Sequence, residues 1–184
     1  MKDQKHTPPP LRDAATIILV REENKALEVY LLKRNDASKF MGGLYVFPGG
    51  VVEAEDKTIE TWTPQIDMTL TQIETRLGGN QFSREKALGF GIAAIRETLE
   101  EAGVLIASDK NKSREDFDEI SRYRLNKDLP NSWFQTKMTA DNWNLSFSRL
   151  GRLSHWITPK RMKKRFDTRF FIVLSRFQIG CPEN

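Results

Sequence analysis

The sequence predicts an α/β fold around a mixed β-sheet, either of the α+β kind or with three layers. Short apolar runs bounded by polar residues predict several strands, and one longer segment repeats its apolar residues with the period of a helix. Strands and helices alternate irregularly, which is typical of a mixed sheet. The chain has 184 residues, enough for one domain with its own core.

The N-terminal half supplies the first predicted strands. Residues 14–20 predict a buried strand, and residues 27–33 predict a second strand that forms a hairpin with it. A short strand over 44–47 then runs into a Pro-Gly-Gly turn that ends at Gly50.

Two segments are expected to lie outside this framework. Residues 1–12 contain three consecutive prolines and predict a flexible arm. Residues 57–83 are polar and aperiodic, and they predict an insertion with one helix near 68–77. We therefore expect one domain over residues 13–184, interrupted by this insertion.

A long helix is predicted over residues 84–102. Its apolar stripe consists of Leu88, Ile92, Ile95 and Leu99. Gly103 follows where a left-handed C-terminal cap is expected. The remaining predicted elements are a strand over 104–107, a helix opened by the capping pair Ser113 and Asp116 and ending near Tyr123, and strands over 152–157 and 169–176.

Composition restricts the class of protein. No apolar run is long enough to cross a bilayer and no secretory signal is visible, so no membrane partner is expected. A single cysteine, Cys181, excludes an internal disulfide, and two histidines with one cysteine argue against a structural zinc site. A reducing cytoplasm is the expected compartment.

Positive charge is concentrated near the C-terminus. Residues 142–184 carry nine Lys and Arg against two Asp and Glu. Most of this excess lies in Lys160, Arg161, Lys163, Lys164 and Arg165, with Arg169. The cluster fits an anionic partner, such as the phosphates of a small substrate or of nucleic acid, and it equally fits a solvated basic turn. No arginine–aromatic platform supports a dedicated nucleic-acid module.

Three carboxylates crowd one side of the long helix. On a helical wheel Glu97, Glu100 and Glu101 fall within an arc of about 100°, opposite the apolar stripe. Like charges so placed repel one another, so we expect a cation among them. Mg²⁺ and Mn²⁺ prefer carboxylate oxygens, and Arg96 can reach Glu100 one turn away to orient it. Taken alone, the cluster also fits a solvated helix face.

A glycine-rich segment precedes this helix. The sequence Phe-Pro-Gly-Gly ends at Gly50 and is followed by Glu53, Glu55 and Asp56. Glycines there allow backbone groups to approach a phosphate or a metal ion, which a Cβ would prevent. Taken alone, Pro-Gly-Gly is also an ordinary turn.

Together the two segments resemble the Nudix box, Gly-x5-Glu-x7-Arg-Glu-U-x-Glu-Glu-x-Gly-U, in which U is a bulky apolar residue. The positions that match in register are Arg96, Glu97, Glu100, Glu101, Gly103 and Val104. The chain departs from the motif at three places. Asp56 occupies the first glutamate position, residues 57–95 replace the seven-residue spacer, and Thr98 replaces the first U.

The long insertion resembles one branch of the family, the peroxisomal-type coenzyme A diphosphatases. Segments 40–50, 156–159 and 165–171 are similar to segments of that branch, and the resemblance covers about residues 12–177. It implies a Nudix α/β/α sandwich around a mixed sheet. It also implies an enzyme in which water cleaves the P–O–P bridge of a nucleoside diphosphate linked to another moiety. The implied substrate is coenzyme A, acyl-coenzyme A or a related nucleotide derivative, with Mg²⁺ or Mn²⁺ as cofactor.

The resemblance also implies residue roles. Glu100 and Glu101 would be metal ligands, Glu97 a third ligand or the base that accepts the proton of water, and the Gly50 carbonyl a further ligand. Arg96, Glu97 and Glu100 form the expected catalytic set.

Substrate contacts are less clearly marked. Arg34 and Lys39 stand in a segment that loosely resembles the coenzyme A pyrophosphatase motif, and they would meet phosphates of the substrate, or else are exposed charges at the end of a strand. Each tryptophan fits either the core or a base-stacking role, and these are Trp62, Trp133, Trp143 and Trp156.

The end of the chain carries an expectation of its own. Relatives usually continue past the strand near 170–174 with another strand and a helix, for which residues 177–184 are too few. The chain is therefore expected to lack part of the fold, or to complete its sheet with a partner such as a second copy in a homodimer. This leaves open the alternative of a truncated, non-catalytic Nudix-like protein that binds nucleotides or regulates, and a further one of an RNA-directed role through the basic run.

Overall fold

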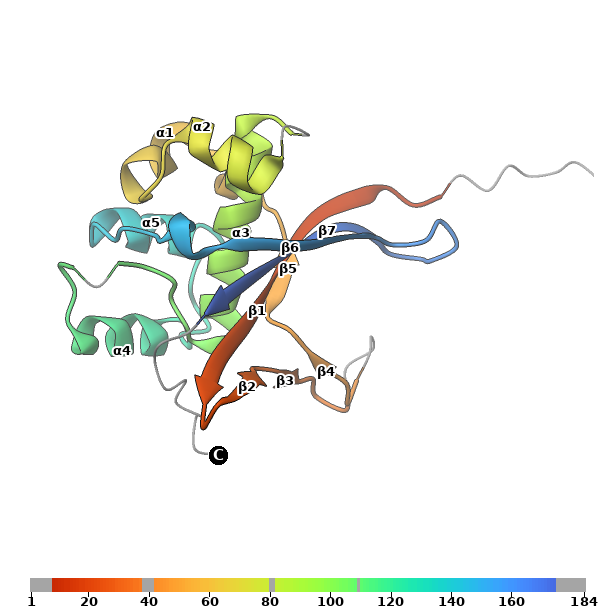
Figure 1. Cartoon of the computed structure of the whole chain (residues 1–184), viewed down its shortest axis with the longest axis horizontal. Helices are drawn as coiled ribbons and strands as arrows, with labels where there is room; N and C mark the ends of the chain where they lie inside the picture. Colours follow the sequence, from red (N-terminus) through yellow and green to blue (C-terminus); the bar gives the residue numbers. More distant parts are fainter. Residues whose placement is uncertain (1–7, 38–41, 80–81, 109, 175–184) are drawn as a thin grey trace, which may run out of the picture.

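A mixed sheet of five strands forms the centre of the computed structural model, which describes residues 8–37, 42–79, 82–108 and 110–174 (Figure 1). The strands are β1 (Leu11–Glu23), β2 (Ala26–Val29), β5 (Gly49–Val51), β6 (Gly151–Ile157) and β7 (Arg165–Leu174). Their order is β2-β1-β7-β6, and β5 also pairs with β1. Strands β1 and β7 run parallel, and the other neighbours are antiparallel. The α/β class that the sequence predicts is confirmed.

Strand β1 contains the predicted strand 14–20 and extends beyond both of its ends. Ala15, Ile17 and Leu19 alternate along it and are buried on the face that holds the core. β1 begins at Leu11, so the last two residues of the expected arm belong to the sheet. The first seven residues of that arm lie outside the described part of the chain.

The predicted hairpin is present, but the strand expected over 27–33 is divided. Its first part is β2, and its second part, β3 (Leu32–Lys33), pairs with β4 (Tyr45–Val46) in a separate small sheet. The chain must leave β1 after Tyr30, because β5 occupies the same edge of β1 further along. The local sequence shows no sign of this competition for one edge.

The Pro-Gly-Gly segment is also different from the prediction. Gly49 and Gly50 lie in an extended strand that pairs with Thr16 and Ala15, where the sequence predicts a turn. A Cβ at Gly49 would lie 2.5 Å from the carbonyl oxygen of Ala15, so glycine allows the two strands to meet closely.

Helix α3 (Arg84–Ala102) matches the predicted helix and packs along β1 and β5. Ser83 caps its N-terminus by accepting the N–H of Lys86, and Gly103 ends it with a left-handed φ of 71°. The predicted apolar stripe is fully buried. Arg96 and Thr98, which flank the acidic side of the helix, are buried. On the acidic side itself Glu97 and Glu100 are half-buried and Glu101 is exposed.

The other helices are short. They are α1 (Ile59–Trp62), α2 (Leu70–Ile73), α4 (Arg114–Tyr123) and α5 (Trp133–Ala140), with 3-10 turns η1 (Glu55–Lys57), η2 (Thr63–Gln65) and η4 (Phe147–Arg149) and the π-turn η3 (Glu74–Gly78). α2 and η3 lie where the insertion was expected to contain a helix, and α4 begins with the predicted capping box. α5 was not predicted. The strand predicted over 104–107 is wrong, because of these residues only Ala107 makes a β-bridge, to Leu145.

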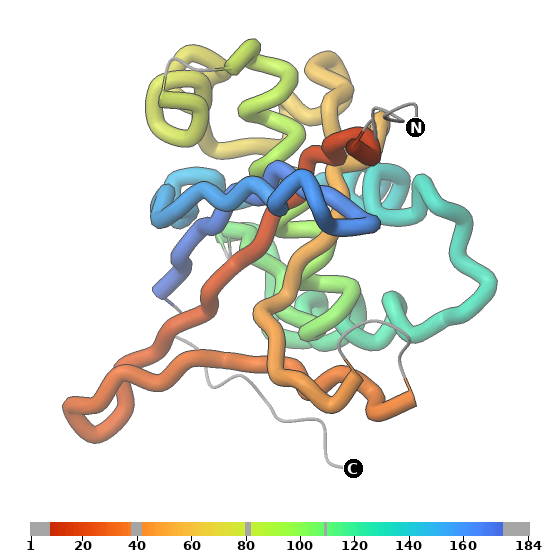
Figure 2. Tube along the Cα trace, turned by 90° about the vertical axis from the view of Figure 1, so that its right-hand side faces the viewer, coloured from red at the N-terminus to blue at the C-terminus, as the bar shows by residue number. Residues whose placement is uncertain are grey.

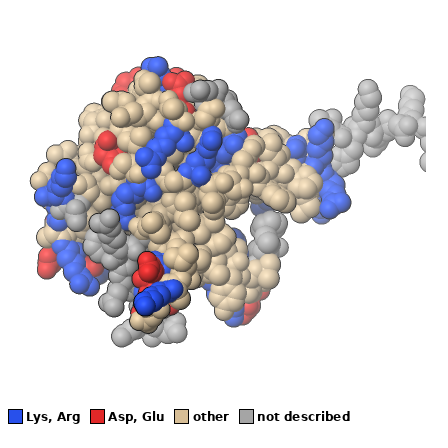
Figure 3. All heavy atoms as spheres, viewed as in Figure 1, with Lys and Arg blue, Asp and Glu red and all other residues tan. Residues whose placement is uncertain are grey.

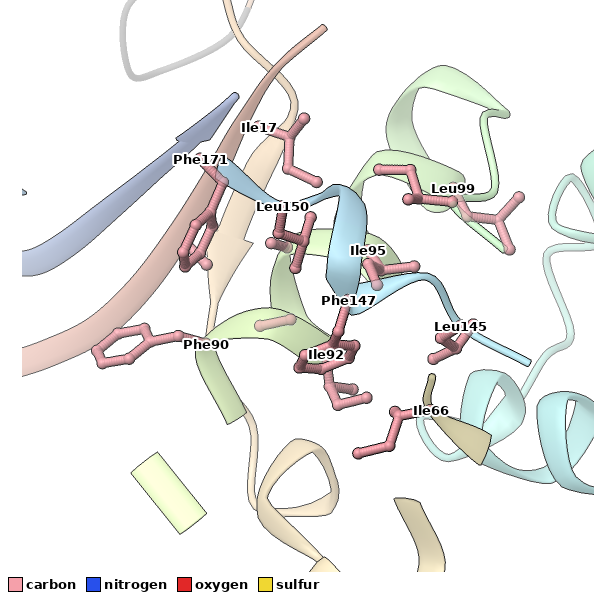
Figure 4. Packing of buried hydrophobic residues seen from close by; sticks show 14 of the residues in the cluster. Ile17, Ile66, Phe90, Ile92, Ile95, Leu99, Leu145, Phe147, Leu150 and Phe171 are labelled. Carbon is pink, nitrogen blue, oxygen red and sulfur yellow. The ribbon is translucent and has the colours of Figure 1, made fainter. Parts of the chain in front are cut away.

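The helices gather on one side of the sheet, as two views at right angles show (Figures 1 and 2). The core lies between them and the sheet, where Phe171 and Ile17 face Ile92, Ile95 and Leu99 (Figure 4). The strand and helix expected to be missing concern residues after 174, which lie outside the described part. In the described residues, no helix has the length and hydropathy to span a bilayer.

The basic run forms the loop that joins β6 to β7. Lys160, Arg161, Lys163 and Lys164 are exposed, and Figure 3 shows basic side chains gathered over this hairpin. Arg169 does not belong to this surface, because it is only 7% exposed and stacks on the ring of Phe82 at 4.3 Å.

Candidate active site

The candidate site lies where α3 crosses β5. Glu97 rests directly against Gly50, so closely that a Cβ at position 50 would clash with its carboxylate. Glu101, one turn later, accepts the backbone N–H of Gly49 at 2.9 Å. The fold therefore joins the glycine-rich segment to the acidic helix face, although residues 51–96 separate them in sequence.

Arg96 organises the acidic side chains around it. Its Nε and Nη2 donate to the two carboxylate oxygens of Asp56, both at 3.0 Å, and Nη2 also donates to the carbonyl of Val51. Its Nη1 donates to Glu97 at 2.8 Å and to Glu100 at 3.0 Å. Arg96 and Asp56 are buried, so this paired arrangement fixes the guanidinium as a rigid support for both glutamates.

Burial raises the pKa of all three glutamates on this helix face. It raises the pKa of Glu97 to about 7, an effect that the charge of Arg96 partly offsets. Burial likewise raises the pKa of Glu100 and of Glu101 above the ordinary glutamate value. The site thus holds more negative charge than Arg96 compensates, and an added cation would relieve it.

The chemistry of this donor set fits Mg²⁺ or Mn²⁺, which prefer hard oxygen ligands. Carboxylates are available from Glu97, Glu100 and Glu101, and a carbonyl from Gly50. Among the described residues, however, no three Asp, Glu, His or Cys side chains converge closely enough to form a complete metal site.

Helix α5 supplies a contact that the sequence did not predict. The indole Nε1–H of Trp133 donates to Oε1 of Glu100 at 3.1 Å. No local pattern marks this residue, because the contact depends on how α5 packs against α3. Trp62 and Trp143 are also buried in the core, whereas Trp156 is 62% exposed.

Of the two residues predicted to contact the substrate, the structure describes Arg34 but not Lys39. Arg34 lies near Glu101, because its charge contributes to lowering the pKa of that carboxyl group. The Nε of Arg34 is buried and has no hydrogen-bond partner among the described residues. Lys39 lies outside the described residues.

Comparison with known families decides the relationship. The NUDT19 Nudix domain family matches residues 11–179 of the chain. The chain belongs to the Nudix hydrolase family. Its departures from the Nudix box can now be explained by geometry. Asp56 pairs with Arg96 in spite of the long insertion, and Thr98 is buried with its hydroxyl donating to the carbonyl of Ala94.

Individual Nudix relatives are similar at low identity. The chain is 32% identical over 163 residues to "Putative nudix hydrolase 7" of Caenorhabditis elegans, covering 89% of this chain and 44% of that protein. It is 27% identical to acyl-coenzyme A diphosphatase NUDT19 of Xenopus laevis, covering 79% and 46%. For the human NUDT19 protein the identity is 25%, covering 83% and 49%. The chain therefore spans less than half the length of these relatives.

A solved structure supports the fold. The crystal structure of a NUDIX hydrolase from Alicyclobacillus acidocaldarius superposes with a TM-score of 0.63 at 23% identity, covering 90% of this chain and 70% of that one. At this identity the likeness concerns the fold alone.

Proposed function

We propose that the chain hydrolyses the P–O–P bond of a nucleoside diphosphate linked to another moiety, with coenzyme A or acyl-coenzyme A as the substrate class. The observation that carries this proposal is the junction of β5 and α3. There Glu97 and Glu101 meet Gly50 and Gly49 around the rigid Arg96. Phosphoryl transfer depends mainly on positioning and charge stabilisation, and a rigid acidic site can provide both when it holds divalent ions.

Each residue has a proposed role in this site. Glu100 and Glu101, with the Gly50 carbonyl, would hold Mg²⁺ or Mn²⁺, which neutralises charge as the bridging bond breaks. Glu97 would be a further ligand or would accept the proton of the attacking water, and its pKa of about 7 suits proton transfer near neutral pH. Arg96 keeps Glu97 and Glu100 in fixed positions.

The substrate class rests on two supports. Several relatives are named acyl-coenzyme A diphosphatases, and Arg34 offers a buried, unpaired donor near Glu101. We propose that Arg34 and Lys39 contact phosphates of the substrate. Phosphate groups are strong acceptors for a guanidinium, so an arginine at this position suits the role.

The basic loop is not assigned to this site. Gly50 pairs with Ala15, and Ala15 pairs with Arg169, four residues along β7 from Arg165 at the loop. At about 3.3 Å per residue the loop begins roughly 13 Å from that row of the sheet. From the composition and the lack of an arginine–aromatic platform, we propose a small-molecule substrate, no nucleic-acid partner and a reducing cytoplasm as the compartment.

A hydrolysis panel tests the proposal. The 184-residue chain is incubated with coenzyme A, acyl-coenzyme A, ADP-ribose, NADH and dinucleoside polyphosphates, each with Mg²⁺ and with Mn²⁺. We expect metal-dependent cleavage of the coenzyme A compounds that Glu100→Gln abolishes. A folded wild-type chain that cleaves no compound would favour the alternative of a non-catalytic nucleotide-binding protein.

A further inference from the structure

Glu100 is held from two sides by different parts of the chain. Its Oε2 accepts Nη1 of Arg96 from the same helix, at 3.0 Å. Its Oε1 accepts Nε1 of Trp133 from α5, at 3.1 Å. Neither carboxylate oxygen is therefore free to rotate without losing a hydrogen bond.

The end of helix α4 and helix α5 make two further contacts near Glu100. Arg124, at the end of α4, donates Nη1 to the backbone carbonyl of Glu100 at 2.8 Å. Gln135, on α5, donates to the hydroxyl of Thr58 at 3.1 Å, beside the loop that carries Asp56. Helices α4 and α5 thus support both acidic segments of the site, although they lie far outside the motif in sequence.

The indole of Trp133 is itself well fixed. Its ring lies 5.9 Å from the ring of Tyr123 and 5.9 Å from that of Phe134, and the residue is only 8% exposed. The N–H is consequently aimed at Glu100 at little further cost in side-chain entropy.

A neutral donor suits this position better than a charged one. Arg96 already brings one positive charge to Glu100, and a lysine or arginine in place of Trp133 would add a second that competes with a bound cation. The indole N–H fixes one oxygen and leaves the net charge of the carboxylate unchanged. Each carboxylate oxygen can accept more than one contact, so the hydrogen bond and a metal bond are compatible.

We propose that Trp133 is a positioning residue for Glu100, presetting that carboxylate for a divalent cation. This inference rests on the proposed function. It adds a specific role for α5, a helix that the Nudix box does not include.

The test measures Mn²⁺ binding to the 184-residue chain by electron paramagnetic resonance. Trp133→Phe keeps an aromatic ring but removes the N–H, and Trp143→Phe is the matched control. Trp143 is also buried, and its Nε1 has no hydrogen-bond partner in the described part of the chain. Loss of one orienting hydrogen bond should raise the Kd for Mn²⁺ about 3- to 10-fold in Trp133→Phe. Trp143→Phe should bind as the wild type does.

A second measurement does not depend on how well the variant folds. The indole N–H resonances of the wild-type chain are followed by NMR during a Mg²⁺ titration. We expect the resonance of Trp133 to shift with saturation and that of Trp143 to stay in place.

The possible results distinguish the proposed function from the proposed role of Trp133. If the wild-type chain binds no divalent cation, the proposed function fails, and this inference with it. If the wild type binds Mn²⁺ but Trp133→Phe binds equally well, or if Mg²⁺ leaves the Trp133 resonance unmoved, only the role of Trp133 is overturned.

Discussion

At the scale of single residues, the site depends on the buried guanidinium group of Arg96, which is surrounded by carboxylates. Arg96 contacts Asp56, Glu97 and Glu100 together, and its burial makes each contact costly to lose. The same crowding leaves the glutamates with raised pKa values. The same few side chains therefore stabilise the fold and form the acidic site in which we propose that a divalent cation binds.

Asp56 should contribute mainly to stability. Asp56→Ala breaks a buried ion pair and leaves the buried Nε of Arg96 without an acceptor, so we expect a loss of about 3 kcal/mol in the free energy of unfolding. Glu28→Gln is the control, because Glu28 pairs with Arg21 at the surface and should change stability by less than about 1 kcal/mol. Urea unfolding of both variants measures the difference, and equal effects would contradict the structural role of Asp56.

The ionised Glu97 should lower the free energy of unfolding when no metal is bound. At pH 8 its carboxylate is ionised and only 16% exposed, so Glu97→Gln should stabilise the metal-free chain by about 1 kcal/mol. Mn²⁺ at roughly 100 times its Kd should stabilise the wild type by about 2.7 kcal/mol. The variant should gain much less. Thermal unfolding with and without Mn²⁺ checks both, and an equal gain in the two proteins would exclude Glu97 as a ligand.

Gly50 should be required for the arrangement of the site. Gly50→Ala places a methyl group against the carboxylate of Glu97, which must move, so we expect a large loss of Mn²⁺ binding. Gly78→Ala is the matched control, since its Cβ would meet its nearest neighbour at an ordinary 3.4 Å. Retention of full Mn²⁺ affinity by Gly50→Ala would show that Glu97 has room to adjust.

At the scale of elements, α3 was predictable because its signals are local. The apolar period and the Gly103 stop lie within the helix or next to it. Strand β5 was not predictable, because its two glycines and one valine form a strand only when they pair with β1. Helix α5 has no clear apolar period, so its place against Glu100 could not be anticipated.

The core position of Leu99 tests the assignment of helix faces. Leu99 is inaccessible in the core, so Leu99→Asp buries a charge without a partner and should unfold the domain. Glu100→Gln, at the next position of the helix, should leave the fold intact. Circular dichroism of the two variants checks this contrast, and a folded Leu99→Asp chain would mean that the helix is oriented differently.

At the scale of the whole molecule, the motif joins Gly50 and the acidic helix face in one pattern, and the structure places Gly50 against Glu97. The motif could not locate the supporting helices, because residues 57–83 and 114–140 are placed by packing and not by the motif. The chain matches less than half the length of the acyl-coenzyme A diphosphatases, so its own activity has to be measured directly.

The most direct measurement is hydrolysis of coenzyme A in ¹⁸O-labelled water with Mg²⁺ or Mn²⁺, analysed by mass spectrometry. We predict that one phosphate product carries one ¹⁸O atom, because water attacks phosphorus. Glu100→Gln should be slower by more than about 100-fold, since even residues that only orient metal ligands cost 10- to 100-fold when lost. A folded wild-type chain that releases no labelled phosphate product, or a Glu100→Gln chain as active as the wild type, would contradict the account.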